Sequence, residues 1–325
     1  MRATQCTQPW ESLCGDPLDW LLDTSRPNLH WKVLTEMVRR PSSSPAVLRA
    51  RGGANAVEPI GSLLADLQPD GTWADEGRYW RLYMGPGWRL VAAVQWGADP
   101  TDPRLQAAAQ TLIETAPGEG GFALRADRAP VPWLTARVLH TLAELGWCRH
   151  PRFQEGLAWL EEGAVSTPHG GWVITARNQT SDECVVTAVA VLETLSACSE
   201  QRRVALHSRA VESVMRCLGG LRRGSLRLGH PCLARTDLAE ILWALARTKL
   251  PLRTQMIPAL QSLQRKQRHG GRWRREVPVP GSLPIDRRPQ VGSPSRWVTL
   301  KSAVALMHYA VEARLPRMYP RKPRI

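Results

Sequence analysis

The chain has 325 residues, of which 43% are apolar and 22% are charged, a balance typical of a globular protein with a sizeable core. No run of about 18 uncharged apolar residues occurs, so the sequence predicts no membrane-spanning helix. The net charge of +14 is uneven, because residues 201–325 hold 26 Lys and Arg against 6 Asp and Glu. This basic half suits a diphosphate or an anionic membrane surface, or is simply a solvated face. Nucleic acid is not expected as a partner, because net positive charge is the only feature that favours it and charge alone is not sufficient evidence.

The seven cysteines are dispersed and include no CxxC pair. The N-terminus leads into no apolar stretch before Asp16, which argues against a secretory signal. Reduced thiols in a cytoplasmic protein are therefore the expectation.

Residues 1–57 read as an N-terminal helical extension. Apolar residues from Trp31 to Val38 fall at helical spacing, and this helix is expected to end before Pro41. Ser42–Pro45 and Arg51–Gly53 are expected to be breaks.

Helices then alternate along the chain in pairs. They are expected over residues 57–67, 82–96, 105–115, 133–145, 153–162, 185–195, 204–218, 238–246, 257–264 and 297–311. The first helix of each pair is the more apolar, and the second carries a charged face. This predicts an inner ring of buried helices inside an outer ring of amphipathic ones, or the same pairs stacked as an open solenoid.

Glycine-rich turns carrying one large residue recur every 47 to 54 positions. The large residues are Trp73, Phe122, Trp172, Leu226 and Trp273. A fixed period of this kind indicates a repeat architecture, in which each unit buries its apolar face against its neighbours. The three turn tryptophans are expected to pack between outer helices and fasten successive repeats. The repeats define a predicted domain over residues 58–312, followed by a basic tail, 313–325, that is expected to be disordered.

These turns, together with residues 16–22 (DPLDWLL) and 294–300 (PSRWVTL), resemble the terpenoid cyclase and protein prenyltransferase superfamily. The similarity covers roughly residues 16–311 and is greatest to short, single-toroid bacterial proteins with prenyltransferase/squalene oxidase repeats. It implies an all-α fold, an α/α toroid of about five helix-pair repeats. It also implies an apolar isoprenoid or lipid-like ligand in a central cavity, with isoprenoid cyclisation or prenyl transfer. The alternative is a non-catalytic lipid-binding or protein-interaction scaffold, because a fold hosts functions without implying one.

The resemblance also implies a candidate zinc site. Protein prenyltransferases take two zinc ligands from an Asp-x-Cys pair at one inner-helix start and a His from the next. Asp182 and Cys184 match that pair, and His230 precedes the following inner helix. Arg235 lies nearer the position where a ligand is wanted, and we include it among the ligand-binding candidates. The alternative is that Asp182 caps its helix and Cys184 is a small buried hydrophobe.

A proton donor is the second chemical candidate. The Asp-x-Asp-Asp motif of class II terpene cyclases does not occur in this chain. Asp182 and Glu183 form the only adjacent acidic pair at an inner-helix start, and a buried acid with a raised pKa would serve as the donor.

Tryptophan dominates the aromatic residues, with 14 Trp against 4 Tyr and 2 Phe. Tryptophan faces stabilise cations best. The residues placed in or at the start of inner helices are therefore cavity-lining candidates, with ordinary core packing as the alternative: Trp88, Trp133, Trp243 and Trp297. A catalytic toroid predicts a Trp-lined cavity of several hundred cubic ångström with an acid or a metal. A scaffold predicts a filled cavity, or an apolar one without a convergent acid.

Overall fold

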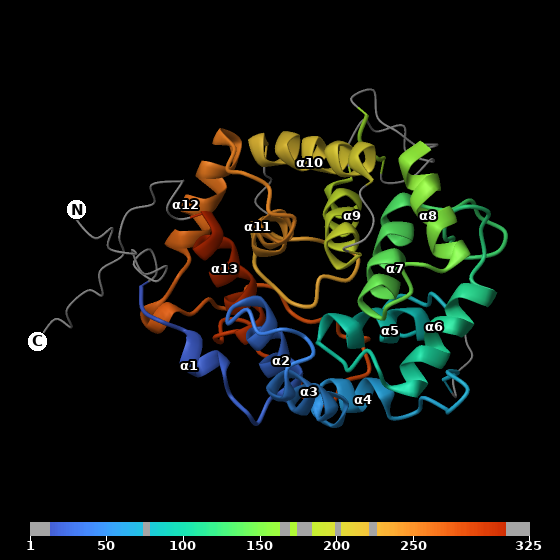
Figure 1. The fold of residues 1–325 in the computed structure, drawn as a ribbon, viewed down its shortest axis with the longest axis horizontal. Helices are drawn as coiled ribbons and strands as arrows, with labels where there is room; N and C mark the ends of the chain where they lie inside the picture. The colour runs from blue at the N-terminus through green and yellow to red at the C-terminus, as the bar shows by residue number, and fades with distance from the viewer. Residues whose placement is uncertain are drawn as a thin grey trace, which may run out of the picture.

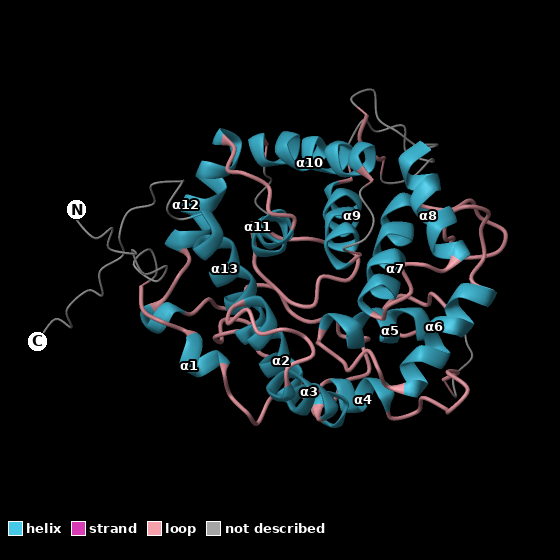
Figure 2. Cartoon of the chain, in the orientation of Figure 1, coloured by secondary structure: helices cyan, strands magenta, loops and turns pink. Residues whose placement is uncertain are grey.

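The computed structural model describes residues 14–73, 79–162, 170–173, 184–198, 203–220 and 226–309. Within these ranges the regular structure is helical, and β-type pairing is limited to isolated bridges (Figure 2). The all-α prediction is confirmed. In the described ranges no helix is long and apolar enough to cross a membrane.

The helices form two concentric sets (Figure 1). The inner set is α2 (Pro27–Glu36), α5 (Pro86–Gln95), α7 (Pro132–Glu144), α9 (Val185–Ala197), α11 (Leu238–Arg247) and α13 (Arg296–Tyr309). The outer set is α1 (Leu18–Leu21), α3 (Pro45–Gly52), α4 (Ile60–Leu64), α6 (Pro103–Thr115), α8 (Pro151–Glu162), α10 (Val204–Gly219) and α12 (Ile257–Arg265). Single 3-10 turns lie at Ala54–Ala56, Thr254–Met256 and His269–Gly271.

The sequence difference between the two sets follows from their burial. Helix α9 buries an unbroken run from Thr187 to Thr194, whereas α10 buries one stripe that includes Leu206, Ala210 and Val214. A helix surrounded by others has no solvated face, and an outer helix needs only one apolar stripe. Around the ring, α5 packs on α7, α7 on α9, α9 on α11, α11 on α13, and α13 on α2.

The ring closes where α2 meets the end of α5. The Asn28 amide donates to the Trp96 carbonyl at 3.0 Å, and the Trp31 indole donates to the Gly97 carbonyl at 2.8 Å. Gly97 has a φ of +76°, and a Cβ there would lie 2.4 Å from the Asn28 carbonyl oxygen. The backbones approach this closely only with glycine. The structure is therefore a closed toroid, and the open solenoid is wrong.

The three turn tryptophans are each tied to the outer helix that precedes them, and their role in joining successive repeats remains a prediction. Each indole N–H donates to a backbone carbonyl near the end of the preceding outer helix. The bonds run from Trp73 to Leu63 at 3.0 Å, from Trp172 to Leu160 at 3.1 Å and from Trp273 to Leu263 at 2.8 Å. All three side chains are buried. Each tryptophan therefore holds its turn in place both by burying its ring and by hydrogen-bonding its indole N–H.

The N-terminal segment is built into the ring. Helix α2 occupies an inner position, and α3 begins at Pro45, where the sequence predicted a break. Proline is tolerated in the first turn of a helix because its missing N–H has no intrahelical partner there. The domain boundary at residue 57 remains a prediction.

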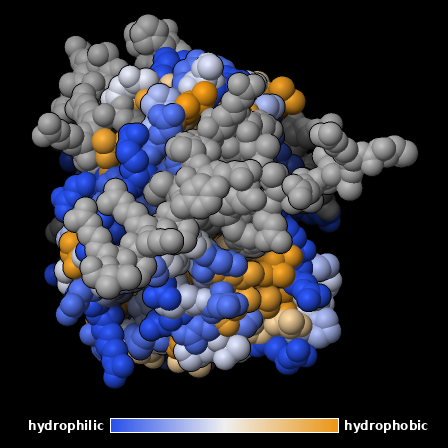
Figure 3. All heavy atoms as spheres, turned by 90° about the vertical axis from the view of Figure 1, so that its left-hand side faces the viewer, coloured by the Kyte–Doolittle hydropathy of each residue, from blue (hydrophilic) through white to orange (hydrophobic). Residues whose placement is uncertain are grey.

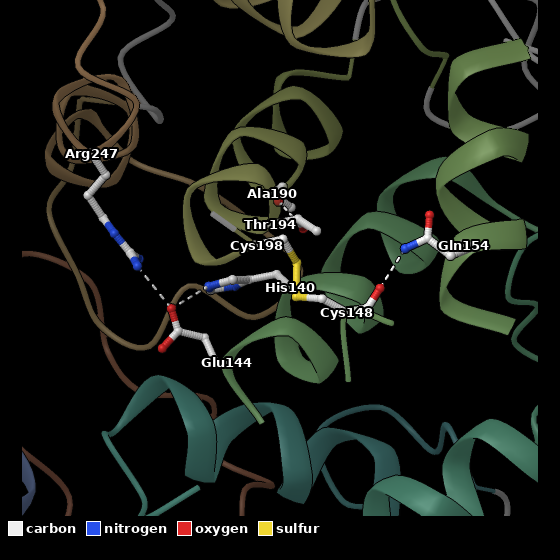
Figure 4. The surroundings of a disulfide bond; sticks show 8 residues. All are labelled: His140, Glu144, Cys148, Gln154, Ala190, Thr194, Cys198 and Arg247. Carbon is white, nitrogen blue, oxygen red and sulfur yellow. Dashed lines mark hydrogen bonds and ion pairs between the residues drawn. A yellow bond between two sulfur atoms is a disulfide. The ribbon is translucent and has the colours of Figure 1, made fainter. Parts of the chain in front are cut away.

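The chain contains a disulfide that the sequence did not predict (Figure 4). Cys148 and Cys198 are bonded, with their Cα atoms 6.0 Å apart and 50 positions apart in sequence. The two residues follow successive inner helices, α7 and α9, which pack on each other in the ring. The expectation of uniformly reduced cysteines is wrong at this pair, and the cytoplasmic location remains a prediction.

The face that carries α1 and α12 is largely hydrophilic, with its visible apolar residues gathered mainly in one limited area (Figure 3). The apolar core of the described residues lies within and between the two helix sets.

Candidate functional site

The centre of the ring is a narrow chamber of about 30 Å³, lined by both charged and apolar side chains. Each of the six inner helices contributes to its wall. The lining residues are Lys32, Glu36, Val94, Gln95, His140, Glu144, Glu193, His230, Glu240, Trp243, Trp297, Leu300 and Lys301. A space of this size holds a small number of water molecules.

Arg137 joins three inner helices behind the chamber wall. Its guanidinium, which is fully buried, lies 3.1 Å from the Glu193 carboxylate and 3.5 Å from that of Glu240. It also donates to the backbone carbonyl of Arg235 at 3.3 Å. A buried guanidinium is stable only when carboxylates and further hydrogen bonds compensate its desolvation, and Arg137 has both.

Lys301 completes the central cluster from α13. Its ammonium lies 3.4 Å from the Glu240 carboxylate and 4.9 Å above the Trp243 ring. Burial by itself would lower the pKa of Lys301, but the nearby carboxylates, Glu240 first, raise it. Lys301 is therefore charged at neutral pH.

The two carboxyl groups of this cluster differ. Burial raises the pKa of Glu193, and the adjacent Glu240 charge raises it further. Burial acts in the same direction on Glu240, but Lys301 and Arg137 hold the pKa of Glu240 below its usual value. Glu240 therefore carries the negative charge, and Glu193 is the group that takes up a proton more readily.

A second charge cluster surrounds Glu144 (Figure 4). Its carboxylate lies 2.6 Å from Lys32, 3.1 Å from Arg247 and 3.7 Å from His140. Burial would raise the pKa of Glu144, but Lys32 and Arg247 lower it well below its usual range. This cluster links α2, α7 and α11 across the ring.

The predicted cavity tryptophans separate into two groups. Trp243 and Trp297 line the chamber. The Trp243 indole donates to Glu36 at 2.7 Å, and its ring already faces the Arg247 guanidinium at 4.7 Å. Trp88 and Trp133 are absent from the chamber wall and stack on each other at 6.0 Å. Trp88 also meets Trp80 and Tyr83 edge-on, which is packing typical of an aromatic core.

The candidate zinc ligands are only partly described. Asp182 and Glu183 lie outside the described residues. Cys184 directly precedes α9, and burial raises the pKa of its thiol, which disfavours the thiolate that zinc requires. The described ranges contain no group of three His, Cys, Asp or Glu side chains that would hold a metal ion. Without Asp182, the described residues do not fit a zinc site, and the zinc ligands remain a prediction.

His230 is an unusual buried histidine. Its ring stacks on Trp297 at 4.7 Å and meets Trp96 edge-on at 6.0 Å. Burial lowers the pKa of His230 well below its usual value, and the Lys301 charge lowers it further. The imidazole is therefore neutral, and neither nitrogen has a hydrogen-bond partner among the described residues.

Asp237 is a buried acid that the sequence analysis missed. It caps α11, accepting bonds from the Glu240 amide at 3.0 Å and the Gly229 amide at 2.6 Å. Burial raises the pKa of Asp237, and Arg235 at 3.7 Å opposes that shift. Arg235, predicted to bind a ligand, is thus held against Asp237. Its ligand-binding role remains a prediction.

The central charges left a signal in the sequence that was overlooked. Arg137, Glu193 and Lys301 interrupt helical runs that are otherwise apolar or small. A charge inside a fully buried helix must find a partner of opposite sign, as Arg137 does in Glu193 and Lys301 does in Glu240.

No family model and no curated protein matches the chain. Among solved structures, the apo form of the type II terpene cyclase MstE from Scytonema is 17% identical, with a TM-score of 0.42, over 96% of this chain and 92% of that one. A variant of that enzyme with geranylgeranyl dihydroxybenzoate is 14% identical, with a TM-score of 0.30, over 79% and 96%. A variant with merosterolic acid A is 15% identical, with a TM-score of 0.30, over 78% and 95%. At these values the fold assignment rests on the helix ring of the chain itself.

Proposed function

We propose that this toroid is a non-catalytic binding protein, and that its centre carries out neither isoprenoid cyclisation nor prenyl transfer. The observation that carries the proposal is the size and lining of the central chamber, about 30 Å³ with charged side chains from five of the six inner helices on its wall. Sites for drug-sized or larger ligands occupy roughly 300–1,000 Å³ and are mostly apolar.

The pairing of the charges supports the same conclusion. Arg137, Lys301 and Glu144 each lie within ion-pair distance of an internal partner. A substrate entering the chamber would have to separate these pairs, and an unpaired buried charge is costly. A polyene offers no polar group to replace the lost partner. An apolar isoprenoid or lipid-like ligand would therefore bind outside the chamber.

The test is incubation of the full chain with squalene and with geranylgeranyl diphosphate, followed by mass spectrometry of the extracted products. We expect both compounds to be recovered unchanged. A cyclised or transferred product made by the wild-type chain, and lost in E193Q, would overturn the proposal.

Glu193 favours a second candidate function, that of a cyclase with a proton donor at this position. Its raised pKa is the specific observation behind this candidate, because a donor must hold its proton near neutral pH. This candidate predicts that a product forms, that E193D retains part of the activity and that E193Q retains none.

A further inference from the structure

A cleft of about 560 Å³ lies between the start of α2, residues 57–59 and the segment that leads into α13. Five arginines and one glutamate are its charged lining residues: Arg26, Arg275, Arg287, Arg288, Arg296 and Glu58. The central chamber balances its charges, whereas this cleft carries an excess of positive charge.

Arg275 is the residue that marks the cleft as a binding site. Its side chain is only 2% exposed, yet no carboxylate of the described ranges lies within ion-pair distance of it, and the Asp237 charge acts on it from farther away. Its one hydrogen bond is a long one, 3.4 Å to the Val277 carbonyl, and its Nε has no partner. Burial lowers the pKa of Arg275 to about 10, so the group is still charged at neutral pH. The desolvation of a buried cation that lacks a carboxylate partner is compensated when an anion occupies the cleft.

The remaining arginines of the cleft add to its positive charge. Arg296 and Arg26 share a single carboxylate, that of Asp23, at 2.9 and 3.9 Å. Arg288 donates to the Pro280 carbonyl at 2.6 Å, and Arg287 is exposed. Helix α13 begins at Arg296 and spans 14 residues, so its positive dipole end adds to the same field.

The wall of the cleft is also partly apolar. Leu29, Val57, Pro59, Trp96 and Trp297 contribute to it. Guanidinium groups match phosphate oxygens in bidentate geometry, and the apolar wall matches a hydrocarbon or ring.

We propose that this cleft binds the phosphate or diphosphate group of a small ligand, with the apolar part of that ligand packed against Trp96 and Trp297. This inference rests on the proposed binding function and gives it a place and a ligand class. A flat bilayer or a nucleic-acid backbone would contact Arg26 and Arg287 at the rim, but it would not reach Arg275, which is 2% exposed.

The experiment is calorimetric titration of the full chain with inorganic diphosphate, geranyl diphosphate and geraniol. We expect geranyl diphosphate to bind more tightly than inorganic diphosphate, and geraniol to bind at least tenfold more weakly than geranyl diphosphate. R275M is expected to weaken diphosphate binding at least tenfold. R26Q/R287Q changes only exposed rim residues, which leaves the fold intact, and is expected to weaken binding severalfold. The matched control is R125Q, because Arg125 is exposed, pairs with Asp127 and is not part of the cleft.

Absence of diphosphate binding, or equal affinity in the wild type and in both R275M and R26Q/R287Q, would overturn the inference. Co-sedimentation with phosphatidic acid vesicles separates the sources of phosphate. Vesicle binding without binding of soluble diphosphate also overturns the cleft site, since it places the contact on the outer surface. Failure of the proposed function would appear as conversion of geranyl diphosphate, which the same samples report by mass spectrometry independently of affinity.

Discussion

The central chamber and the cleft beside α13 each bury a guanidinium, with opposite consequences. Arg137 lies within ion-pair distance of two carboxylates, from α9 and α11. Arg275 is nearly as buried but has only one long bond to a carbonyl. In the first arrangement the protein's own carboxylates compensate the buried charge of Arg137, and the ion pairs hold the helices together. The second leaves a buried charge for a bound anion to compensate, which is why we propose binding at the edge of this toroid rather than at its centre.

The largest expected effect comes from breaking the central pairing. R137M leaves Glu193 and Glu240 without their shared guanidinium, and removing one partner of a buried pair costs about 3–5 kcal/mol. We expect the free energy of unfolding to fall by that amount in urea titrations.

The double variant R137M/E193M is the control for that change. It removes the guanidinium together with its nearer carboxyl group and leaves Glu240 paired with Lys301 at 3.4 Å. Recovery of at least half of the lost stability is expected. If R137M alone unfolds with wild-type stability, the central pairs do not hold the ring.

The disulfide sharpens the comparison, because it joins the segments after two helices that flank the chamber. C148S/C198S releases a loop of 50 residues, and loss of such a crosslink typically costs about 2–4 kcal/mol. The free energy of unfolding of the double variant, measured without reductant, checks this value. Reductant should destabilise the wild type and leave the double variant unchanged.

His230 lies between the two regions, stacked on Trp297, which borders both. Its folded-state pKa is held well below its usual value of 6.5. Below pH 6.5 the unfolded chain therefore binds a proton that the folded chain does not, and stability falls as the pH falls. We expect H230L to remove a slope of up to about 1.4 kcal/mol per pH unit below that pH. Parallel pH–stability curves for the two proteins would contradict this assignment.

The smallest expected effect is on the cleft itself. R275M removes a buried cation that has no carboxylate partner. Loss of its hydrogen bond lowers the stability of the fold, whereas removal of the desolvated charge raises it, so the two effects oppose each other. We expect its unfolding free energy to stay within about 1 kcal/mol of the wild type, far from that of R137M. A loss of stability as large as that of R137M would show Arg275 to be a structural residue.

Much of the fold was predictable because it is encoded by local pattern. The apolar run of α9 and the charged face of α8 indicated inner and outer helices, and the turn tryptophans were expected as fasteners. Helix α3 was missed because Pro45 was interpreted as part of a break, although proline is also common in the first turn of an α-helix. The site was predicted less well. Trp243 and Trp297 do line the chamber, but its charged wall, Asp237 and the disulfide were not foreseen.

By itself the sequence determined most of the helices after residue 57 and which of them are buried on all sides, because periodicity and turn chemistry act over a few neighbouring residues. Only the tertiary structure decided which charges are compensated. Arg137 meets carboxylates 56 and 103 positions away, while Arg275 meets none among the described residues. Both are arginines in the linear sequence, and the free energy of each depends on groups within a few ångström that only the closed ring brings together.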